Sequence, residues 1–475
     1  MKIQITKLNR FLFSMLLVSG LLACNQKEAE ADKASLWLTT LDKESLLEKK
    51  EVLIKDKNDN TQEKGPTITI DTSQTFQEMD GFGYTLTGGS ALHLNKMSDS
   101  ARSAILQELF GTGKDELGVS YLRLSIGASD LDKEPFSYND LPKGETDVNL
   151  ENFSLANDTL NLIPVVKEIL KIAPEIKILG SPWSPPVWMK DNKGTRGGSL
   201  MKEYYPVYAN YFVKYIEAMK EQGIIIDAIT IQNEPLHPGN NPSMLMLAEN
   251  QAAFIKDHLG PLFAEHNIDT KIILYDHNAD RPDYPISILN DPEVAKYVDG
   301  SAFHLYGGEI EALSEVHKAH PDKNLYFTEQ WVGAPGDFAQ EMSWHTKNLI
   351  IGAPRNWSKN VLEWNLAADE NQEPHTDRGG CDRCLGAITI DGNKVIREPA
   401  YYIIGQASKF VRPGSVRVAS NEPEHIANVA YLTPDGEIAI ILQNTSEKDQ
   451  SVNVELGNNV ASVQLPAGAV GTLVM

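Results

Sequence analysis

The sequence predicts an α/β fold, a (β/α)8 barrel joined to an antiparallel β-sandwich side domain. Apolar segments rich in β-forming residues alternate with helical patterns along most of the chain, as in a closed parallel sheet. Short alternating strands joined by turns then follow in the C-terminal region, as in a sandwich. After an N-terminal leader and a polar stretch, roughly 400 residues remain, which suits a barrel of about 250 residues with insertions and a smaller companion.

Eight segments are candidate barrel strands, and together they place the barrel at residues 80–395. They lie at residues 81–87, 120–127, 177–182, 228–233, 271–275, 301–306, 324–328 and 361–365. Helical patterns separate several of these strands, at residues 163–172, 204–222 and 244–266.

The C-terminal region, residues 396–475, is predicted to form the side domain. It begins with a helix-like stretch at 401–410, and four short strands follow, at 426–432, 437–444, 451–456 and 461–465. The sequences Pro434-Asp435-Gly436 and Gly457-Asn458-Asn459 supply turns between them. Residues 66–79, just before the barrel, are expected to add a further strand to this domain.

The N-terminus resembles a bacterial lipoprotein signal peptide covering residues 1–23. Lys2, Lys7 and Arg10 precede an apolar run at 11–22, which leads to Cys24. The run is shorter than the roughly 20 residues that a membrane span needs. We therefore expect cleavage before Cys24 and lipidation of its thiol, with an ordinary cleaved secretory signal as the alternative.

Residues 24–65 are rich in Lys, Glu and Asp and are interpreted as a lipid-anchored tether. The protein is thus expected at the bacterial cell envelope, anchored in the outer membrane on its periplasmic or outer side. The formal net charge of −22 argues against nucleic acid as a partner and against an electrostatic grip on anionic lipid. Contact with the membrane is therefore expected through the lipid anchor alone.

Two cysteines remain, Cys381 and Cys384, in a Gly-rich loop after the last barrel strand. In an oxidising compartment this pair favours a small disulfide. A structural zinc site would need four ligands, and a thioredoxin-like motif would need a βαβ context. No metal cluster of His and carboxylates is apparent in the sequence, and no cofactor is expected.

Two of the predicted strands end on a glutamate, Glu234 in one and Glu329 in the other. Residues at the C-terminal ends of barrel strands point into the active site, so two such carboxylates can flank one glycosidic bond. One must then be an acid at neutral pH while the other stays ionised.

Seven motifs, in order along the chain, resemble those of glycoside hydrolase family 30, which includes lysosomal glucosylceramidase and microbial β-1,6-glucanases. The resemblance runs from about residue 66 to the end and rests on Asp80-Gly81-Phe82-Gly83, Leu122-Arg123-Leu124-Ser125, Ser181-Pro182-Trp183-Ser184-Pro185-Pro186, Asn233-Glu234-Pro235, Phe303-His304-Leu305-Tyr306, Thr328-Glu329-Gln330-Trp331 and Glu363-Trp364-Asn365-Leu366. It implies a retaining β-glycosidase with a barrel and a side domain built from both ends of the domain.

The resemblance also implies roles for the two glutamates. Glu234 matches the acid/base, whose pKa is expected to be raised by a nearby carboxylate. Glu329 matches the nucleophile, about 5 to 5.5 Å from Glu234 as in retaining enzymes. Asn233 would donate to the sugar 2-hydroxyl.

By the same resemblance, several other residues surround the sugar. Asp130, Trp183 and Trp364 would line the subsite for the glucosyl unit. His304 and Tyr306 match the pair beside the nucleophile, and Tyr306 is expected to hydrogen-bond it.

The substrate is predicted from the loop that carries Cys381 and Cys384. Its Gly-Gly-Cys-x-x-Cys-x-Gly pattern looks like the β-1,6-glucanase branch, and Thr87-Gly88-Gly89 replaces the Thr-Asp of the lysosomal enzyme. We therefore expect a β-1,6-glucan as substrate. The alternatives are a glucosylceramidase or another β-glucosidase or β-xylosidase of the family, and, more remotely, a non-catalytic carbohydrate-binding lipoprotein.

Overall fold

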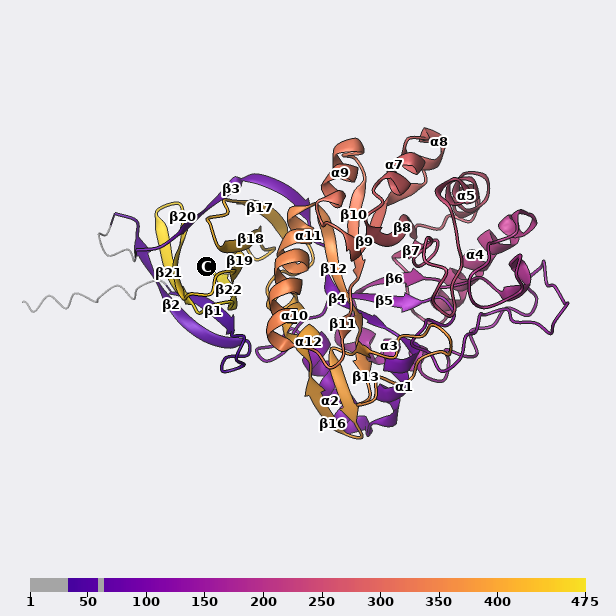
Figure 1. Cartoon of the computed structure of the whole chain (residues 1–475), viewed down its shortest axis with the longest axis horizontal. Coiled ribbons are helices and arrows are strands. Elements are labelled where there is room, and N and C mark those ends of the chain that lie inside the picture. Colours follow the sequence, from indigo (N-terminus) through magenta and orange to yellow (C-terminus); the bar gives the residue numbers. More distant parts are fainter. Residues whose placement is uncertain (1–32, 59–63) are drawn as a thin grey trace, which may run out of the picture.

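The computed structural model describes residues 33–58 and 64–475. It contains a barrel and a side domain that lie next to each other along the long axis of the molecule (Figure 1). The predicted signal peptide and Cys24 lie outside the described residues. Among the helices that are described, none has the length and apolar character to cross a membrane.

Eight parallel strands form the barrel, and it closes because the last strand pairs with the first. In chain order the strands are β4 (Gly81–Leu86), β5 (Tyr121–Ser125), β6 (Lys177–Ser181), β7 (Ala228–Thr230), β8 (Lys271–Ala279), β9 (Val298–Gly308), β10 (Asn324–Glu329) and β12 (Ser358–Asn365). All eight predicted strands are therefore confirmed. β8 and β9 run further toward the C-terminal edge than predicted, which carries additional side chains into that end of the barrel.

Apolar side chains close the interior of the barrel below this edge. The buried residues come from seven of the strands and form one cluster: Tyr121, Leu179, Ala228, Ile273, Ala302, Tyr326 and Leu362. Such a layer makes a barrel interior a packed core rather than a pore. Polar groups that enter the barrel must therefore gather above this layer, at the C-terminal ends of the strands.

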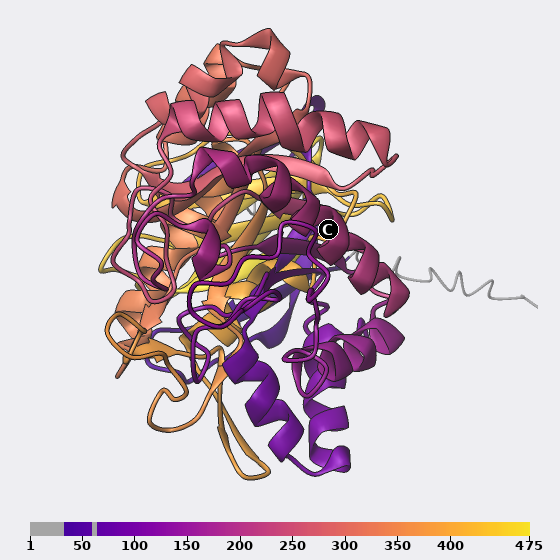
Figure 2. The same cartoon turned by 90° about the vertical axis from the view of Figure 1, so that its right-hand side faces the viewer.

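Helices surround the barrel, which faces the viewer in Figure 2 with the side-domain strands behind it. The predicted helices correspond to α3 and α4 and to the run from α5 through the π-helical η3 to α6. The described helices are α1 (Gly88–Lys96), α2 (Asp99–Phe110), α3 (Leu162–Ile172), η1 (Val187–Met189), η2 (Lys202–Tyr204), α4 (Tyr205–Glu221), α5 (Ala248–Phe254), η3 (Ile255–Leu259), α6 (Gly260–Glu265), α7 (Asp283–Leu289), α8 (Pro292–Ala295), α9 (Ala312–Ala319), α10 (Phe338–His345), η4 (Thr346–Ile351), α11 (Gly352–Arg355) and α12 (Pro399–Ser408).

Nine described strands form the side domain as a sandwich whose sheet closes on itself. They are β1 (Lys33–Thr39), β2 (Glu48–Asp56), β3 (Thr67–Glu78), β17 (Val416–Ser420), β18 (Ile426–Leu432), β19 (Ile438–Asn444), β20 (Gln450–Leu456), β21 (Asn459–Leu465) and β22 (Val470–Val474). The four predicted C-terminal strands are β18 to β21, and β3 joins them as expected. It pairs in parallel with β20 and antiparallel with β17.

The prediction of a tether over residues 24–65 is wrong for residues 33–56. Strand β1 pairs with β22 at the other end of the chain, and β2 pairs with β1 and β21. Leu36 and Leu38 are buried in the sandwich core, whereas most of β2 is exposed and charged. A half-buried strand with one polar face has a composition similar to that of a tether. Only Ala34, Leu36 and Leu38, at every second position, indicated the buried face of a strand.

The predicted domain boundary at residue 396 also lies too early. Helix α12 was expected in the side domain, but it packs mainly against the barrel elements β4 and α10, and Tyr84 donates a hydrogen bond to the Ala400 carbonyl at 3.1 Å. Its contact with the side domain is smaller and is made with β22. The side domain resumes after α12, at β17. The sequence of a short helix between two domains does not indicate which of the two domains the helix packs against.

A buried histidine connects the outer helices to the last barrel strand. His345 in α10 lies 2.7 Å from Glu363 Oε1 through Nδ1 and 3.1 Å from Glu341 Oε2 through Nε2. Burial lowers the pKa of His345, but the charge of Glu363 and the hydrogen bonds with both glutamates raise it to about 9. Glu363 directly precedes Trp364, so this network fixes the end of β12.

The stability of the protein is expected to fall as the pH rises from about 6.5 to 9. The imidazolium of His345 is favoured in the folded state, so its contribution is complete below its ordinary pKa of 6.5 and is lost as the pH passes about 9. We expect a loss of roughly 1–3 kcal/mol across this pH range, the order of magnitude that a pKa raised from 6.5 to about 9 supplies. Denaturant titrations at pH 6, 7, 8 and 9 measure it.

A His345→Gln variant provides the comparison. It should be less stable than the wild type at pH 6, and its free energy of unfolding should change less with pH. His266→Gln is the matched control, since His266 is exposed at the end of α6. Equal pH dependence in the wild type and His345→Gln would contradict the role assigned to His345.

Candidate active site

A cavity of about 370 Å³ opens at the C-terminal edge of the barrel. Five of its lining residues were predicted to cleave or bind the sugar: Asp130, Glu234, Tyr306, Glu329 and Trp364. The others are His237, Asn240, His277, Asn278, Trp331, Cys381 and Cys384. A larger hollow of about 1070 Å³, lined by Trp37, Tyr401 and Lys409 among others, lies at the junction with the side domain and contains none of the predicted residues.

Glu329 ends strand β10 and is held on both carboxylate oxygens. Arg123 Nη1 donates to Oε2 at 2.5 Å, and the Tyr306 hydroxyl donates to Oε1 at 3.0 Å. The expected hydrogen bond from Tyr306 is therefore confirmed. A guanidinium on one oxygen and a hydroxyl on the other leave Glu329 with a fixed orientation.

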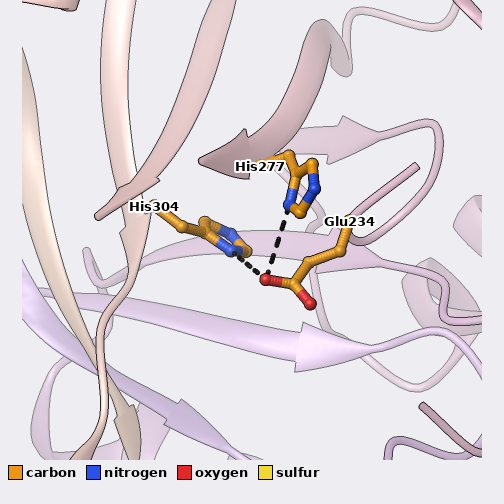
Figure 3. A group of neighbouring side chains, drawn as sticks. All are labelled: Glu234, His277 and His304. Atoms are coloured by element: carbon orange, nitrogen blue, oxygen red, sulfur yellow. Dashed lines mark hydrogen bonds and ion pairs between the residues drawn. The ribbon is translucent and has the colours of Figure 1, made fainter. Parts of the chain in front are cut away.

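Glu234 lies four positions beyond the end of β7 and has a positive φ of 47°. Its backbone N–H donates to the Asp276 carbonyl at 2.9 Å, which holds this left-handed conformation in place. The carboxylate then faces two histidines: Oε1 lies 3.1 Å from His304 Nδ1 and 3.5 Å from His277 Nδ1 (Figure 3). Asn240 Nδ2 donates to Oε2 at 3.4 Å.

His304 contacts both glutamates, but it lies closer to Glu234 than to the Glu329 that it was expected to accompany. Its Nδ1 is 3.1 Å from Glu234 Oε1 and 3.9 Å from Glu329 Oε1. Its Nε2 lies 3.1 Å from Asp276 Oδ1. The two carboxylates are thus near enough to share one imidazole.

Asp276 is the centre of a buried network that sequence reasoning missed. Its Oδ2 accepts from Arg123 Nη2 at 2.8 Å, from Ser181 Oγ at 2.6 Å and from Thr230 Oγ1 at 2.7 Å. The strand-end rule that identified the glutamates would have found Asp276 and His277, had β8 been extended beyond Tyr275. The apolar run ends at Tyr275, and the polar residues Asp276, His277 and Asn278 that follow do not indicate that the strand continues, although β8 extends to Ala279 with positive φ at Tyr275 and Asp276.

Arg123 also orients Asn233, whose Oδ1 accepts from Nη2 at 2.7 Å. This bond uses the amide oxygen and turns the amide nitrogen toward other partners. Trp183 is almost fully buried, with its ring 4.8 Å from the Arg123 guanidinium and 5.2 Å from Trp364. Trp183 therefore supports Trp364 from below, and of these two only Trp364 lines the cavity.

The buried charges shift the pKa values of the site. Burial raises the pKa of Asp130 well above its ordinary range, and the charges of Glu329 and Glu234 raise it further. Burial likewise raises the pKa of Glu329, against the charges of His304 and Arg123, and leaves it above its ordinary value. Asp276 behaves in the opposite way: burial raises its pKa, but Arg123 and His304 hold it well below its ordinary range.

The expected increase in the pKa of Glu234 is wrong for the free site. Burial raises this pKa, but the contacts with His277 and His304 outweigh it, and the value lies below the ordinary one. Burial lowers the pKa of His304, whereas the charge of Glu329 and the hydrogen bonds with Asp276 and Glu234 raise it to about 9. In the free site the proton therefore resides on His304, next to Glu234.

A disulfide joins Cys381 and Cys384 at the rim of the cavity, as expected. The short strand β14 (Cys384–Leu385) pairs with β11 (Val332–Gly333), three residues beyond Glu329. The Ala334 N–H donates to the Arg383 carbonyl at 2.8 Å. The loop after the eighth barrel strand is thus fastened to the loop that follows Glu329.

Family models match both domains of the chain. The glycosyl hydrolase family 30 TIM-barrel domain covers residues 79–411, and the family 30 β-sandwich domain covers residues 414–473. Their limits agree with a domain boundary after α12.

Relatives with assigned names align over most of the chain. An endo-1,6-β-D-glucanase of Aspergillus fumigatus is 34% identical over 420 residues, which cover 82% of this chain and 83% of that protein. The mouse lysosomal acid glucosylceramidase is 30% identical over 419 residues, which cover 82% of this chain and 79% of that protein. The solved structure of the endo-β-1,6-glucanase BT3312 is 34% identical with a TM-score of 0.86 and covers 93% of this chain and 99% of that chain. By sequence and by fold, the chain belongs to glycosyl hydrolase family 30.

Proposed function

We propose that the protein is a retaining endo-β-1,6-glucanase that cleaves β-1,6-glucan by double displacement. The observation that carries the proposal is the pair Glu234 and Glu329 at one cavity, with a disulfide-closed loop at its rim. The names of the fungal relatives and of BT3312 support β-1,6-glucan over glucosylceramide as the substrate.

In the first step Glu329 attacks the anomeric carbon, and the leaving oxygen takes a proton from Glu234. Arg123 and Tyr306 hold the attacking carboxylate in one orientation. The proton that rests between His304 Nδ1 and Glu234 Oε1 moves to Glu234 as the glycosidic oxygen approaches. His304 thereby serves as the proton reservoir of the acid, and Asp276 stabilises its positive charge.

In the second step water attacks the glycosyl-enzyme and releases Glu329. Glu234, now ionised, accepts the proton of this water and passes it to the neutral His304, which returns the site to its starting state. Asn233 would donate through Nδ2 to the sugar 2-hydroxyl, because its Oδ1 is already bonded to Arg123. Asp130 and Trp364 would bind the same sugar through hydroxyl contacts and through the indole.

The test is hydrolysis of pustulan, laminarin, xylan, glucosylceramide and an aryl β-glucoside by the purified protein, with the products sized. We expect short β-1,6-linked oligosaccharides from pustulan and little action on β-1,3- or β-1,4-linked polymers. Hydrolysis of glucosylceramide without action on pustulan would favour a glucosylceramidase instead. Binding of glucan without hydrolysis of any substrate would indicate a carbohydrate-binding protein.

The disulfide loop is expected to increase activity on the polymeric substrate and to have little effect on the chemical step. A Cys381→Ser, Cys384→Ser double variant should lose about tenfold or more of its activity on pustulan and much less on an aryl glucoside, because only the polymer extends beyond the cleaved sugar to the rim. Comparing kcat/KM on both substrates measures the difference. An equal loss on both would show that the loop acts on the catalytic groups instead.

We propose in addition that Cys24 carries a lipid that anchors the enzyme at the bacterial cell envelope. The support is the basic and apolar leader before Cys24. Strand β1 begins nine positions after Cys24, so an anchored side domain would stay within at most about 30 Å of the membrane surface.

A Cys24→Ser variant expressed in a Gram-negative host should move from the membrane fraction to the soluble fraction. Its specific activity should not change, because the site lies in the barrel. Mass spectrometry of the mature N-terminus provides the direct measurement, and an unmodified N-terminus in the wild type would contradict lipidation.

A further inference from the structure

Three side chains from three successive strand ends converge in the active-site cavity: Glu234, His277 and His304 (Figure 3). Their potential ligand atoms all lie within 4.8 Å of one another. The sequence did not reveal this group, because its members are brought together only by the barrel.

The two distances from Glu234 to the histidines match those of a tetrahedral metal site. Zn²⁺ binds His nitrogen and carboxylate oxygen at about 2.0–2.2 Å, and a tetrahedron of this size places its ligand atoms about 3.4 Å apart. Glu234 Oε1 lies 3.1 Å from His304 Nδ1 and 3.5 Å from His277 Nδ1. Two imidazoles and one carboxylate are also a known ligand set for zinc, with a fourth position left open.

His277 has one ion-pair contact among the described residues, 3.5 Å from Nδ1 to Glu234 Oε1. It is only 7% exposed, and its Nδ1 has no hydrogen-bond partner among the described residues, although it points toward Glu234. A buried polar atom without a partner lowers the stability of the folded protein. A metal ion that binds the lone pair of Nδ1 would remove this loss.

His304 is oriented for the same purpose. Its Nε2 lies 3.1 Å from Asp276 Oδ1, so Nδ1 faces Glu234, and a metal ion that displaces the proton from Nδ1 would meet its lone pair. A carboxylate behind a ligating imidazole is the usual arrangement at metal sites, where it fixes the ring and increases its basicity.

The charge around the group favours a cation. Four buried carboxylates, Asp130, Glu234, Asp276 and Glu329, surround the site, and Arg123 and the His304 imidazolium are the positive charges next to them. The carboxylates still outnumber these cations, and their mutual repulsion contributes to the raised pKa of Asp130 and Glu329. A divalent ion would neutralise part of this excess.

From this geometry we infer that Glu234, His277 and His304 form a binding site for a divalent transition metal ion of the Zn²⁺ class. Mg²⁺ and Ca²⁺ are not the ions expected at this site, because they prefer oxygen ligands and the site offers two imidazole nitrogens. Since Glu234 and His277 line the cavity, the open fourth position faces the substrate space.

A metal ion at this position would inhibit the enzyme, a consequence that rests on the proposed function. An ion bound to Glu234 Oε1 and His304 Nδ1 would replace the catalytic proton, which lies between these two atoms. The metal ion would therefore act as a reversible inhibitor that competes with protonation of the leaving group, rather than as a cofactor.

Binding is measured on the metal-free full-length mature protein, first by calorimetry with Zn²⁺ and then by the visible absorption of added Co²⁺. We expect one ion per chain, a four-coordinate Co²⁺ spectrum, and two imidazole ligands in X-ray absorption at the zinc edge. His277→Gln should weaken binding at least tenfold. His237→Gln is the matched control, because His237 lines the same cavity outside the group, and its affinity should stay within twofold of the wild type.

The outcomes separate the metal site from the enzyme activity. No binding, or equal weakening in His277→Gln and His237→Gln, would overturn the site. The zinc-edge spectrum of the wild type decides the matter even if His277→Gln does not fold, and fewer than two imidazole ligands would contradict the inference. Zinc binding with the expected ligands by a protein that hydrolyses no glycoside would sustain the site and refute the proposed function. Hydrolysis that zinc does not inhibit, despite such binding, would refute the inhibitory role.

Discussion

A Glu329→Gln enzyme is expected to lose at least about 10⁴-fold in kcat on pustulan and on aryl β-glucosides alike. The amide keeps the shape of the side chain, its oxygen can still accept from Arg123, and its NH2 group can donate to the Tyr306 hydroxyl oxygen, but it cannot attack the anomeric carbon. The fold and glucan binding should therefore be largely retained, which thermal unfolding and binding titrations check. The loss should be uniform across substrates, because every leaving group depends on the same attack by Glu329.

A 2-deoxy-2-fluoro-β-glucoside with a good leaving group gives an independent measurement. It should label the wild-type enzyme on Glu329, identified by peptide mass spectrometry, and should leave Glu329→Gln unlabelled. Glu370→Gln is the matched control, an exposed glutamate in the loop after β12, and it should react like the wild type. Labelling at another carboxylate, or inversion at the anomeric carbon by NMR, would contradict the assignment.

Removal of the acid/base should instead give a loss that depends on the leaving group. Glu234→Ala is expected to reduce activity on pustulan by about 10²–10⁴-fold, because the sugar hydroxyl of the leaving chain needs a proton. A dinitrophenyl glucoside needs little protonation, so its first step should be much less affected. Steady-state kinetics on both substrates measure the difference.

Azide provides the second part of this test. The small anion fits the space that the missing carboxylate leaves and needs no general base, so it should restore turnover and yield a β-glucosyl azide. An equal loss on both substrates, with no effect of azide, would assign Glu234 a different role.

The pattern of apolar, polar and turn residues along the chain predicts much of the fold without any knowledge of tertiary contacts. The eight barrel strands were found because parallel strands buried on both faces are short apolar runs, and the helices between them have one apolar face. The C-terminal strands were found from alternation and from turn residues. In contrast, β1 and β2 were missed, because they become strands only by pairing with β22 and β21 at the far end of the chain.

The candidate site divides in the same way. Glu234, Glu329 and Tyr306 could be placed from strand ends and motifs, and the Cys381–Cys384 pair from its spacing in a loop. Asp276 and His277 could not, since the apolar run ends at Tyr275 and the polar residues that follow do not indicate that β8 continues to Ala279.

The sequence alone thus determined which residue types reach the C-terminal edge of the barrel, because side-chain direction there follows from strand periodicity. Only the tertiary structure decided which charge each group carries. The pKa of Glu234 depends on His277 and His304, and that of Asp276 on Arg123 and His304, all of which come from other strands or from separate positions in the chain. Burial and Coulomb interactions act through space, so the location of the proton, and with it the possible metal site, is a property of the closed barrel rather than of any motif.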